Sequence, residues 1–136
     1  MTSKVTYIGK LRTKSVHLQS GTEIVTDAPT DNNGKGEAFS PTDMVANSLA
    51  TCMFTIMGIK ANQMGVNFDG STASVTKIMR SEPRMISKII VEFDMNLSAD
   101  GKTKILLERA ALTCPVYLSL HPDIQKEITF NWMDVK

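Results

Sequence analysis

Two cysteines are the residues in this 136-residue sequence best suited to covalent chemistry. Cys52 lies in the middle of a long apolar stretch, and Cys114 directly precedes Pro115. A thiolate is a strong nucleophile, and two thiols can be oxidised together to a disulfide. Free cysteine is also among the most buried residue types, so both could be inert core residues. Composition alone leaves these two interpretations open.

Other catalytic and metal-binding motifs are missing from the sequence. His17 and His121 are the only histidines, and there is no H-E-x-x-H motif and no pair of C-x-x-C motifs. We therefore expect neither a bound zinc or iron ion nor any resident cofactor. There is also no Walker A phosphate loop and no G-x-S-x-G nucleophile motif. His17 is most simply a strand residue and His121 a surface residue.

The composition is that of one ordinary globular domain, which we expect to span residues 1–136. Hydrophobic residues make up 42% and charged residues 21%, and the formal net charge is +1. This balance offers no electrostatic argument for binding nucleic acid or an anionic membrane. The N-terminal MTSKVTYIGK lacks the apolar segment of a secretory signal, which favours a cytoplasmic location.

One long helix is predicted over residues 40–65. Ser40 suits the N-cap, Pro41 the first helical position, and Asp43 the acidic position of a capping box, while Gly65 suits the C-terminal stop. The segment is apolar nearly all round, which predicts a buried helix rather than a membrane span, because polar residues interrupt it. Small polar residues on one side would let another element approach closely: Asn47, Ser48, Thr51 and Thr55.

The remaining segments predict an α+β fold with mostly antiparallel sheet. Before the long helix we expect three strands and then a loop over 27–39; after it, a hairpin, a second helix, a short helical turn and a last strand. The expected strands cover residues 4–11, 15–19, 23–26, 66–79, 86–97 and 126–133, the second helix runs from about 98–101 to about 113, and the turn starts at Pro115.

The position of each cysteine bears on its reactivity. Cys52 is the twelfth residue counted from Pro41, roughly 17 Å along the axis at about 1.5 Å per residue, beyond the reach of the helix dipole. A nearby cation would have to lower its pKa. Cys114 is expected at a helix C-terminus, where the dipole disfavours a thiolate. Cys52 is therefore the better attacking thiol and Cys114 the better resolving partner.

The sequence SPTDMVANSLATC at 40–52, followed by Cys114-Pro115 after a second helix, resembles the OsmC/Ohr family of osmotically induced and organic hydroperoxide resistance proteins. The resemblance covers nearly the whole chain. It implies an OsmC-like fold in which mostly antiparallel sheets from two chains wrap the long central helices of an intertwined homodimer. It also implies a thiol-dependent peroxidase that acts on organic hydroperoxides in oxidative-stress defence.

Carried onto this chain, the resemblance makes Cys52 the peroxidatic and Cys114 the resolving residue. An external dithiol, such as a lipoyl or thioredoxin-type protein, would reduce the disulfide. The family also activates its thiolate with an Arg–Glu pair, and Arg12 is the only arginine in the N-terminal strands. The position after the helix proline, where Ohr proteins carry the Glu, is Thr42, and the nearest acid is Asp43.

Asp43 is thus a second candidate for thiol activation, although it lies nine positions before Cys52 and so on the opposite side of the helix. A capping role for Asp43 and a surface role for Arg12 remain open, and the family departures indicate an outlying branch.

Two other function classes also fit. Nine methionines, four of them in the helix span, could line a pocket for a small apolar ligand in a non-enzymatic binding protein. Alternatively, the cysteine pair could act as a redox sensor that signals through a partner.

Overall fold

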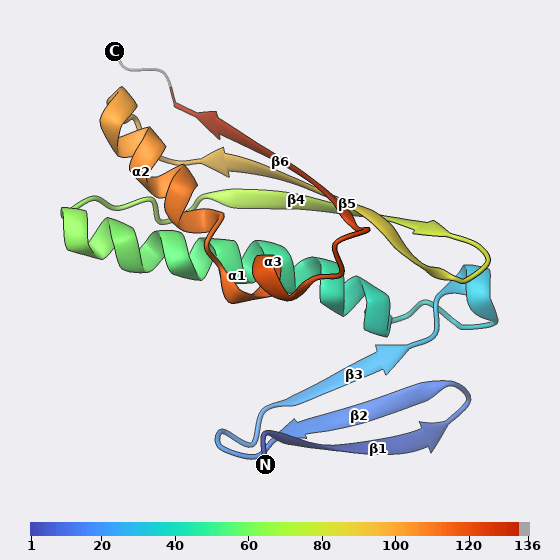
Figure 1. Cartoon of the computed structure of the whole chain (residues 1–136). Coiled ribbons are helices and arrows are strands. Elements are labelled where there is room, and N and C mark those ends of the chain that lie inside the picture. The colour runs from blue at the N-terminus through green and yellow to red at the C-terminus, as the bar shows by residue number, and fades with distance from the viewer. Residues whose placement is uncertain (134–136) are drawn as a thin grey trace. The chain divides into compact units, whose positions relative to one another are not determined.

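The computed structural model describes residues 1–133, which form two compact units. The first unit comprises residues 1–45 and the second begins at residue 46. The long helix α1 (Pro41–Met64) starts in the first unit and runs on into the second (Figure 1). The expectation of one domain over 1–136 stays a prediction.

The first unit is an antiparallel meander of three strands in the order β1-β2-β3, as predicted. Its elements are β1 (Ser3–Gly9), β2 (Arg12–His17), β3 (Glu23–Asp27) and the short helix η1 (Thr30–Asn32). The first turn comes two residues earlier than expected, because Gly9, Lys10 and Leu11 all have positive φ and reverse the chain. Arg12 is consequently the first residue of β2.

The second unit holds a mixed three-stranded sheet in the order β4-β5-β6. Strands β4 and β5 pair antiparallel, whereas β5 and β6 pair in parallel. The sheet and the helices after α1 comprise β4 (Thr72–Arg80), β5 (Met85–Met95), α2 (Gly101–Ala111), α3 (Pro115–Ser119) and β6 (Gln125–Trp132). The predicted α+β class with mostly antiparallel sheet is confirmed.

Strand β4 begins six residues later than predicted. The backbone N–H of Asp69 donates to the Asn67 side chain at 2.6 Å, and Gly70 has a φ of +85°. An Asx turn of this kind competes with strand pairing, so the segment after Gly65 turns before β4 can start at Thr72.

The core of the second unit lies between the inner face of its sheet and the helices (Figure 1). The central strand β5 buries alternate residues, and Phe93 packs edge-on against Phe54 of α1 at a ring separation of 4.8 Å. On its other side Phe93 stacks with Phe130 of β6 at 5.1 Å. The buried alternate residues of β5 therefore pack against the apolar side of α1. This packing fixes where that helix lies on the sheet.

The expectation that α1 is buried all round is wrong for the single chain. It buries six residues, Ala46, Leu49, Ala50, Met53, Met57 and Ala61. Thr51, Thr55 and Ile59 lie on an exposed side, because the sheet covers only one face of the helix. Within residues 1–133, α1 is the one helix whose length and composition would suffice to cross a membrane, a test that the core helix of a soluble protein also passes.

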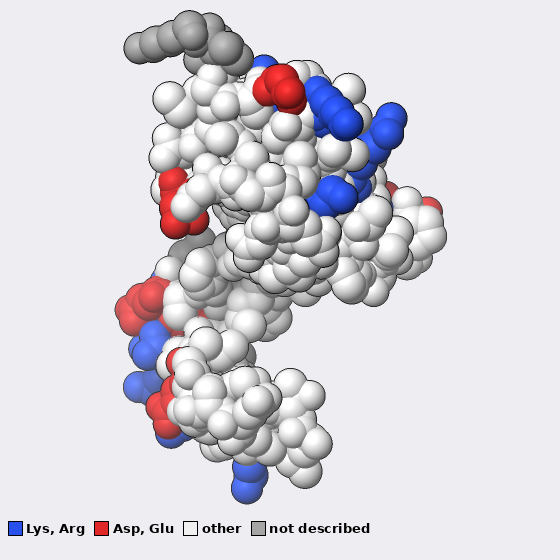
Figure 2. Space-filling view, turned by 90° about the vertical axis from the view of Figure 1, so that its left-hand side faces the viewer, with Lys and Arg blue, Asp and Glu red and all other residues white. Residues whose placement is uncertain are grey.

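Charged side chains of both signs lie on one face of the molecule, which Figure 2 shows. On the face seen in Figure 2, acidic and basic side chains lie in small groups separated by uncharged surface. The near-neutral composition is thus reflected in a mixed surface on this face.

Candidate functional site

Cys52 and Cys114 are brought together in the second unit. Cys52 lies in the middle of α1, partly buried, with its side chain against the core. The Cys52 thiol contributes to the raised pKa of Cys114, so the two side chains lie close together. Both are free thiols. Residues 62 positions apart in the sequence thus bring two thiols close together at the core of the second unit.

Cys114 is held by the start of α3. It is the N-cap residue of this helix, and its Sγ accepts a hydrogen bond from the Tyr117 backbone N–H at 3.2 Å. Pro115 at the first helical position suits this geometry, because proline has no N–H to leave unsatisfied. Placing Cys114 at a helix C-terminus was therefore incomplete, since α2 ends at Ala111 and the thiol caps the next helix.

The two thiols differ in accessibility. The Cys114 side chain is completely buried, whereas Cys52 is partly exposed. Burial raises the pKa of Cys114, and the neighbouring Cys52 thiol adds to this rise, while the Tyr117 N–H opposes it. Such a thiol is poorly suited to start a reaction with an external electrophile, and well suited to follow an oxidation at Cys52.

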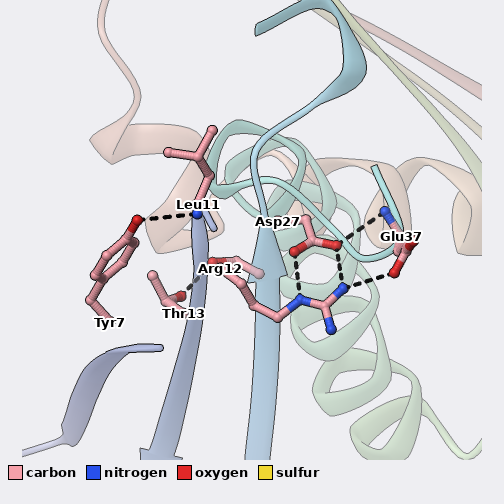
Figure 3. Close-up of polar contacts among 7 residues, drawn as sticks. Tyr7, Leu11, Arg12, Thr13, Asp27 and Glu37 are labelled. Carbon is pink, nitrogen blue, oxygen red and sulfur yellow. Dashed lines mark hydrogen bonds and ion pairs between the residues drawn. The ribbon is translucent and has the colours of Figure 1, made fainter. Parts of the chain in front are cut away.

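Arg12 lies in a cluster of charges within the first unit (Figure 3). Its Nε donates to Asp27 Oδ1 at 2.7 Å and its Nη2 to Asp27 Oδ2 at 2.8 Å, a bidentate ion pair. Nη2 also donates to Glu37 Oε2 at 3.0 Å. This guanidinium is therefore shared by two carboxylates.

Strand pairing sets up this cluster. Arg12 and Asp27 are direct cross-strand partners at the ends of β2 and β3, so their side chains lie on the same face of the sheet. Asp27 is only 2% exposed, and it also accepts the backbone N–H of Glu37 at 3.1 Å. The ion pair with Arg12 holds the pKa of Asp27 below its usual range and raises that of the guanidinium.

The loop between β3 and α1 positions Glu37. Gly34 and Gly36 both approach the backbone of Ala28, and Gly36 N–H donates to the Ala28 carbonyl at 3.2 Å. A Cβ at Gly34 would overlap that carbonyl, so only glycine fits there. The loop folds back onto the end of β3, which brings Glu37 to Arg12.

Asp43 forms the capping box expected of its position. Its side chain accepts the Ser40 backbone N–H at 3.0 Å, and Ser40 Oγ accepts the Asp43 N–H at 3.0 Å. These reciprocal bonds satisfy two backbone donors at the start of α1. The structure thus gives Asp43 a capping role, whereas the carboxylates on Arg12 come from Asp27 and Glu37.

Sequence reasoning missed Asp27 and Glu37. Asp27 could have been found from the meander, because pairing β2 with β3 places an acid at the end of β3 opposite Arg12. Glu37 had no such signal, since its position depends on how the loop folds.

The structure groups no metal ligands around either histidine: among residues 1–133 no set of three or more potential ligands lies together. His17 bonds the Ser20 hydroxyl at 2.6 Å, and His121 lies 3.8 Å from Asp123.

The second unit thus combines a mixed sheet, a long helix and two neighbouring free thiols. The model of the OsmC-like protein family matches residues 34–129. A solved structure from Psychrobacter arcticus 273-4, provisionally called an osmotic stress induced and detoxification response protein, is 53% identical. The match has a TM-score of 0.93 and covers 96% of each chain. The chain belongs to the OsmC-like family, and the resemblance is confirmed.

More distant structures share the fold alone. An OsmC-like protein from Mycoplasma pneumoniae matches with 12% identity and a TM-score of 0.79, over 96% of this chain and 95% of that one. An organic hydroperoxide resistance protein OsmC from Legionella pneumophila matches with 14% identity and a TM-score of 0.71, over 96% and 97%. No curated protein sequence matches the chain.

The Asp27–Arg12 pair predicts acid-sensitive stability. Because the pKa of Asp27 is lower in the folded than in the unfolded chain, its ionisation stabilises the fold above the unfolded value of about 3.9. That stability is lost as pH falls through the lower folded value. Asp27→Asn should therefore lower the urea midpoint at pH 7, and its difference from wild type should shrink on acidification below about pH 4.

Glu37→Gln is the matched control, because Glu37 is exposed and makes a single hydrogen bond to the same guanidinium. It should change the midpoint only slightly at either pH. Equal losses for both variants, or a loss in Asp27→Asn that does not depend on pH, would contradict the assignment.

Proposed function

We propose that this protein is a thiol-dependent peroxidase that reduces organic hydroperoxides through Cys52 and Cys114. The observation that carries this proposal is the proximity of a partly exposed thiol on α1 to a fully buried second thiol. Membership of the OsmC-like family supports it, because the distant relative from Legionella pneumophila is an organic hydroperoxide resistance protein.

The proposed reaction has two covalent steps. The Cys52 thiolate attacks one oxygen of the hydroperoxide, the O–O bond breaks, and the alkoxide leaves and takes up a proton as an alcohol. Cys52 becomes a sulfenic acid. The Cys114 sulfur then attacks the Cys52 sulfur, and hydroxide leaves and is protonated to water as the disulfide forms. An external dithiol restores both thiols and is itself oxidised to a disulfide.

Activation of Cys52 needs a cation, and we propose that Arg12 supplies it. The bidentate pair with Asp27 holds the guanidinium through Nε and Nη2, which fixes its plane. Asp27 and Glu37 would take the part of the acid that the family places after the helix proline, where this chain has Thr42. The two free thiols fit a reducing compartment, so we expect the protein to act in the cytoplasm.

A second copy of the chain is the partner that we propose. The first unit exposes apolar side chains on its three strands, among them Val5, Tyr7, Ile8 and Ile24. A small sheet of this kind needs cover to be stable. On α1, Ile59 is 52% exposed beside the small residues Thr51 and Thr55. A homodimer would bury these apolar surfaces.

Peroxidase activity can be measured directly. We expect wild-type protein to consume tert-butyl hydroperoxide with dithiothreitol as reductant, and Cys52→Ser to fall to the uncatalysed rate, because the hydroxyl is not an effective nucleophile towards peroxide. Cys114→Ser should form a sulfenic acid that dimedone traps. Thr55→Ser, on the same helix, is the control and should keep the wild-type rate. Equal rates for wild type and Cys52→Ser would end the proposal.

We expect opposite results from substitutions of Arg12 and Asp43: the first should lower activity and the second should leave it nearly unchanged. Arg12→Lys loses the bidentate geometry, and kcat/KM should fall by about 10-fold or more if the guanidinium activates Cys52. Asp43→Asn keeps an oxygen that can accept the Ser40 N–H, so activity should stay within about 2-fold of wild type. A large loss in Asp43→Asn, with helix content unchanged by circular dichroism, would instead make Asp43 the activating acid.

The dimer is tested by sedimentation equilibrium. The expected mass is twice that of the 15.0 kDa chain. Ile59→Asp should weaken association, because it puts a charge on the side of α1 that we expect to be covered. Ile105→Asp, on an exposed position of α2, serves as the control. A single-chain mass for the wild type at micromolar concentration would refute the homodimer.

A further inference from the structure

The reduction step poses a question that the family resemblance leaves open, namely which sulfur of the disulfide the reductant attacks. We infer that an external dithiol attacks Cys52 Sγ and that Cys114 leaves as the thiolate. This inference rests on the proposed function for its place in a catalytic cycle, while its chemistry concerns only the cysteine pair.

Access favours attack at Cys52. A thiolate must approach the attacked sulfur in line with the S–S bond, from the side opposite the leaving sulfur. Cys114 has no exposed surface and belongs to the buried core cluster of the second unit. Cys52 is partly exposed on α1. A further chain in an assembly could only add cover to Cys114, so its burial within one chain already excludes a direct approach. Cys52 lies two turns before Ile59 on a similar side of α1, so the inference requires the proposed homodimer to leave the Cys52 sulfur open to solvent.

The leaving-group reactivity opposes attack at Cys52, whereas access favours it. An experiment can therefore decide which of the two effects is larger. Burial raises the pKa of Cys114, and a thiol with a higher pKa leaves more slowly. The raised pKa of Cys114 therefore slows an attack at Cys52, because Cys114 is then the leaving thiol. An approach to Cys114, however, requires α3 to open, and the population of such locally opened states is small.

The start of α3 stabilises the Cys114 thiolate and so offsets part of the rate loss caused by its raised pKa. Once the S–S bond breaks, the electron pair stays on Cys114 Sγ, which already accepts the Tyr117 N–H at 3.2 Å. Hydrogen bonds to a charged acceptor are stronger than those to a neutral one. Tyr117 is thereby a positioning residue through its backbone, and its partly buried side chain covers the core beside Cys114.

The step balances without a further reactant. The dithiol's first sulfur bonds to Cys52 as the Cys52–Cys114 bond breaks, and the Cys114 thiolate takes up a proton. The dithiol's second sulfur then displaces Cys52 from the mixed disulfide, which oxidises the dithiol by two electrons and restores both protein thiols.

The test starts from the full chain, oxidised with diamide so that the disulfide forms independently of any peroxidase activity. Brief reaction with 2-mercaptoethanol, acid quench, alkylation and peptide mapping then locate the mixed disulfide. We expect at least about 10-fold more adduct on Cys52 than on Cys114. Equal amounts, or more on Cys114, would overturn the inference. Because diamide replaces the peroxide, failure of the peroxidase assay would leave this result readable.

Two variants of α3 connect the result to burial. Tyr117→Ala removes a side chain that covers the core and should raise the share of adduct on Cys114. Leu118→Ala, whose side chain is 70% exposed on the same helix, should leave the share unchanged. An unchanged share in both variants would contradict burial by α3 as the cause.

Variants that keep only one of the two cysteines allow a second test, which requires no disulfide. Iodoacetamide should alkylate Cys52 in Cys114→Ser at least about 100-fold faster than Cys114 in Cys52→Ser, compared at the pH-independent limit of each rate so that the thiolate fraction does not enter. In denaturant the two limits should converge. Equal limits in the folded proteins would also overturn the inference.

Discussion

The burial of Cys114 at the start of α3, close to Cys52 on α1, is the interaction on which the proposed thiol chemistry depends. It requires α2 to end at Ala111 and Pro115 to start a new helix three residues after Leu112. It also requires α1 to lie on the inner face of the β4-β5-β6 sheet, where Phe54 meets Phe93. Packing of the second unit thus produces a pair of thiols with unequal access to solvent, and it raises the pKa of the buried one.

The charged cluster of the first unit is held by contacts that do not involve the two cysteines. Arg12 is held at a strand end by Asp27 across the sheet and by Glu37 from a loop closed through Gly34. Two carboxylates on one guanidinium compensate its charge locally. A cation held this firmly is pre-organised, which is what activation of a thiol that lies beyond the reach of its helix dipole would need.

Much of the fold was predictable because its signals are local. The capping residues Ser40, Pro41 and Asp43 placed the start of α1 within one residue, and the β-branched residues over 86–97 identified the strand β5. The errors fall at turns: positive φ at Lys10 and Leu11 ended β1 early, and the Asn67 turn delayed β4. Lys10 and Leu11 carry weak turn signals, so side-chain type did not reveal the first turn, whereas Asn67, Asp69 and Gly70 carry a turn signal that the prediction of an early strand overlooked.

By itself, the sequence determined the two cysteines, the helix that carries Cys52, the Cys114-Pro115 dipeptide and the family. Each of these depends on residues close together in the chain or on an overall pattern. Only the tertiary structure decided that Cys114 is the buried thiol, that Asp43 caps α1, and that Arg12 pairs with Asp27 and Glu37. The physical reason is that burial and ion pairing depend on which surfaces meet, and those surfaces come from segments that are distant along the chain.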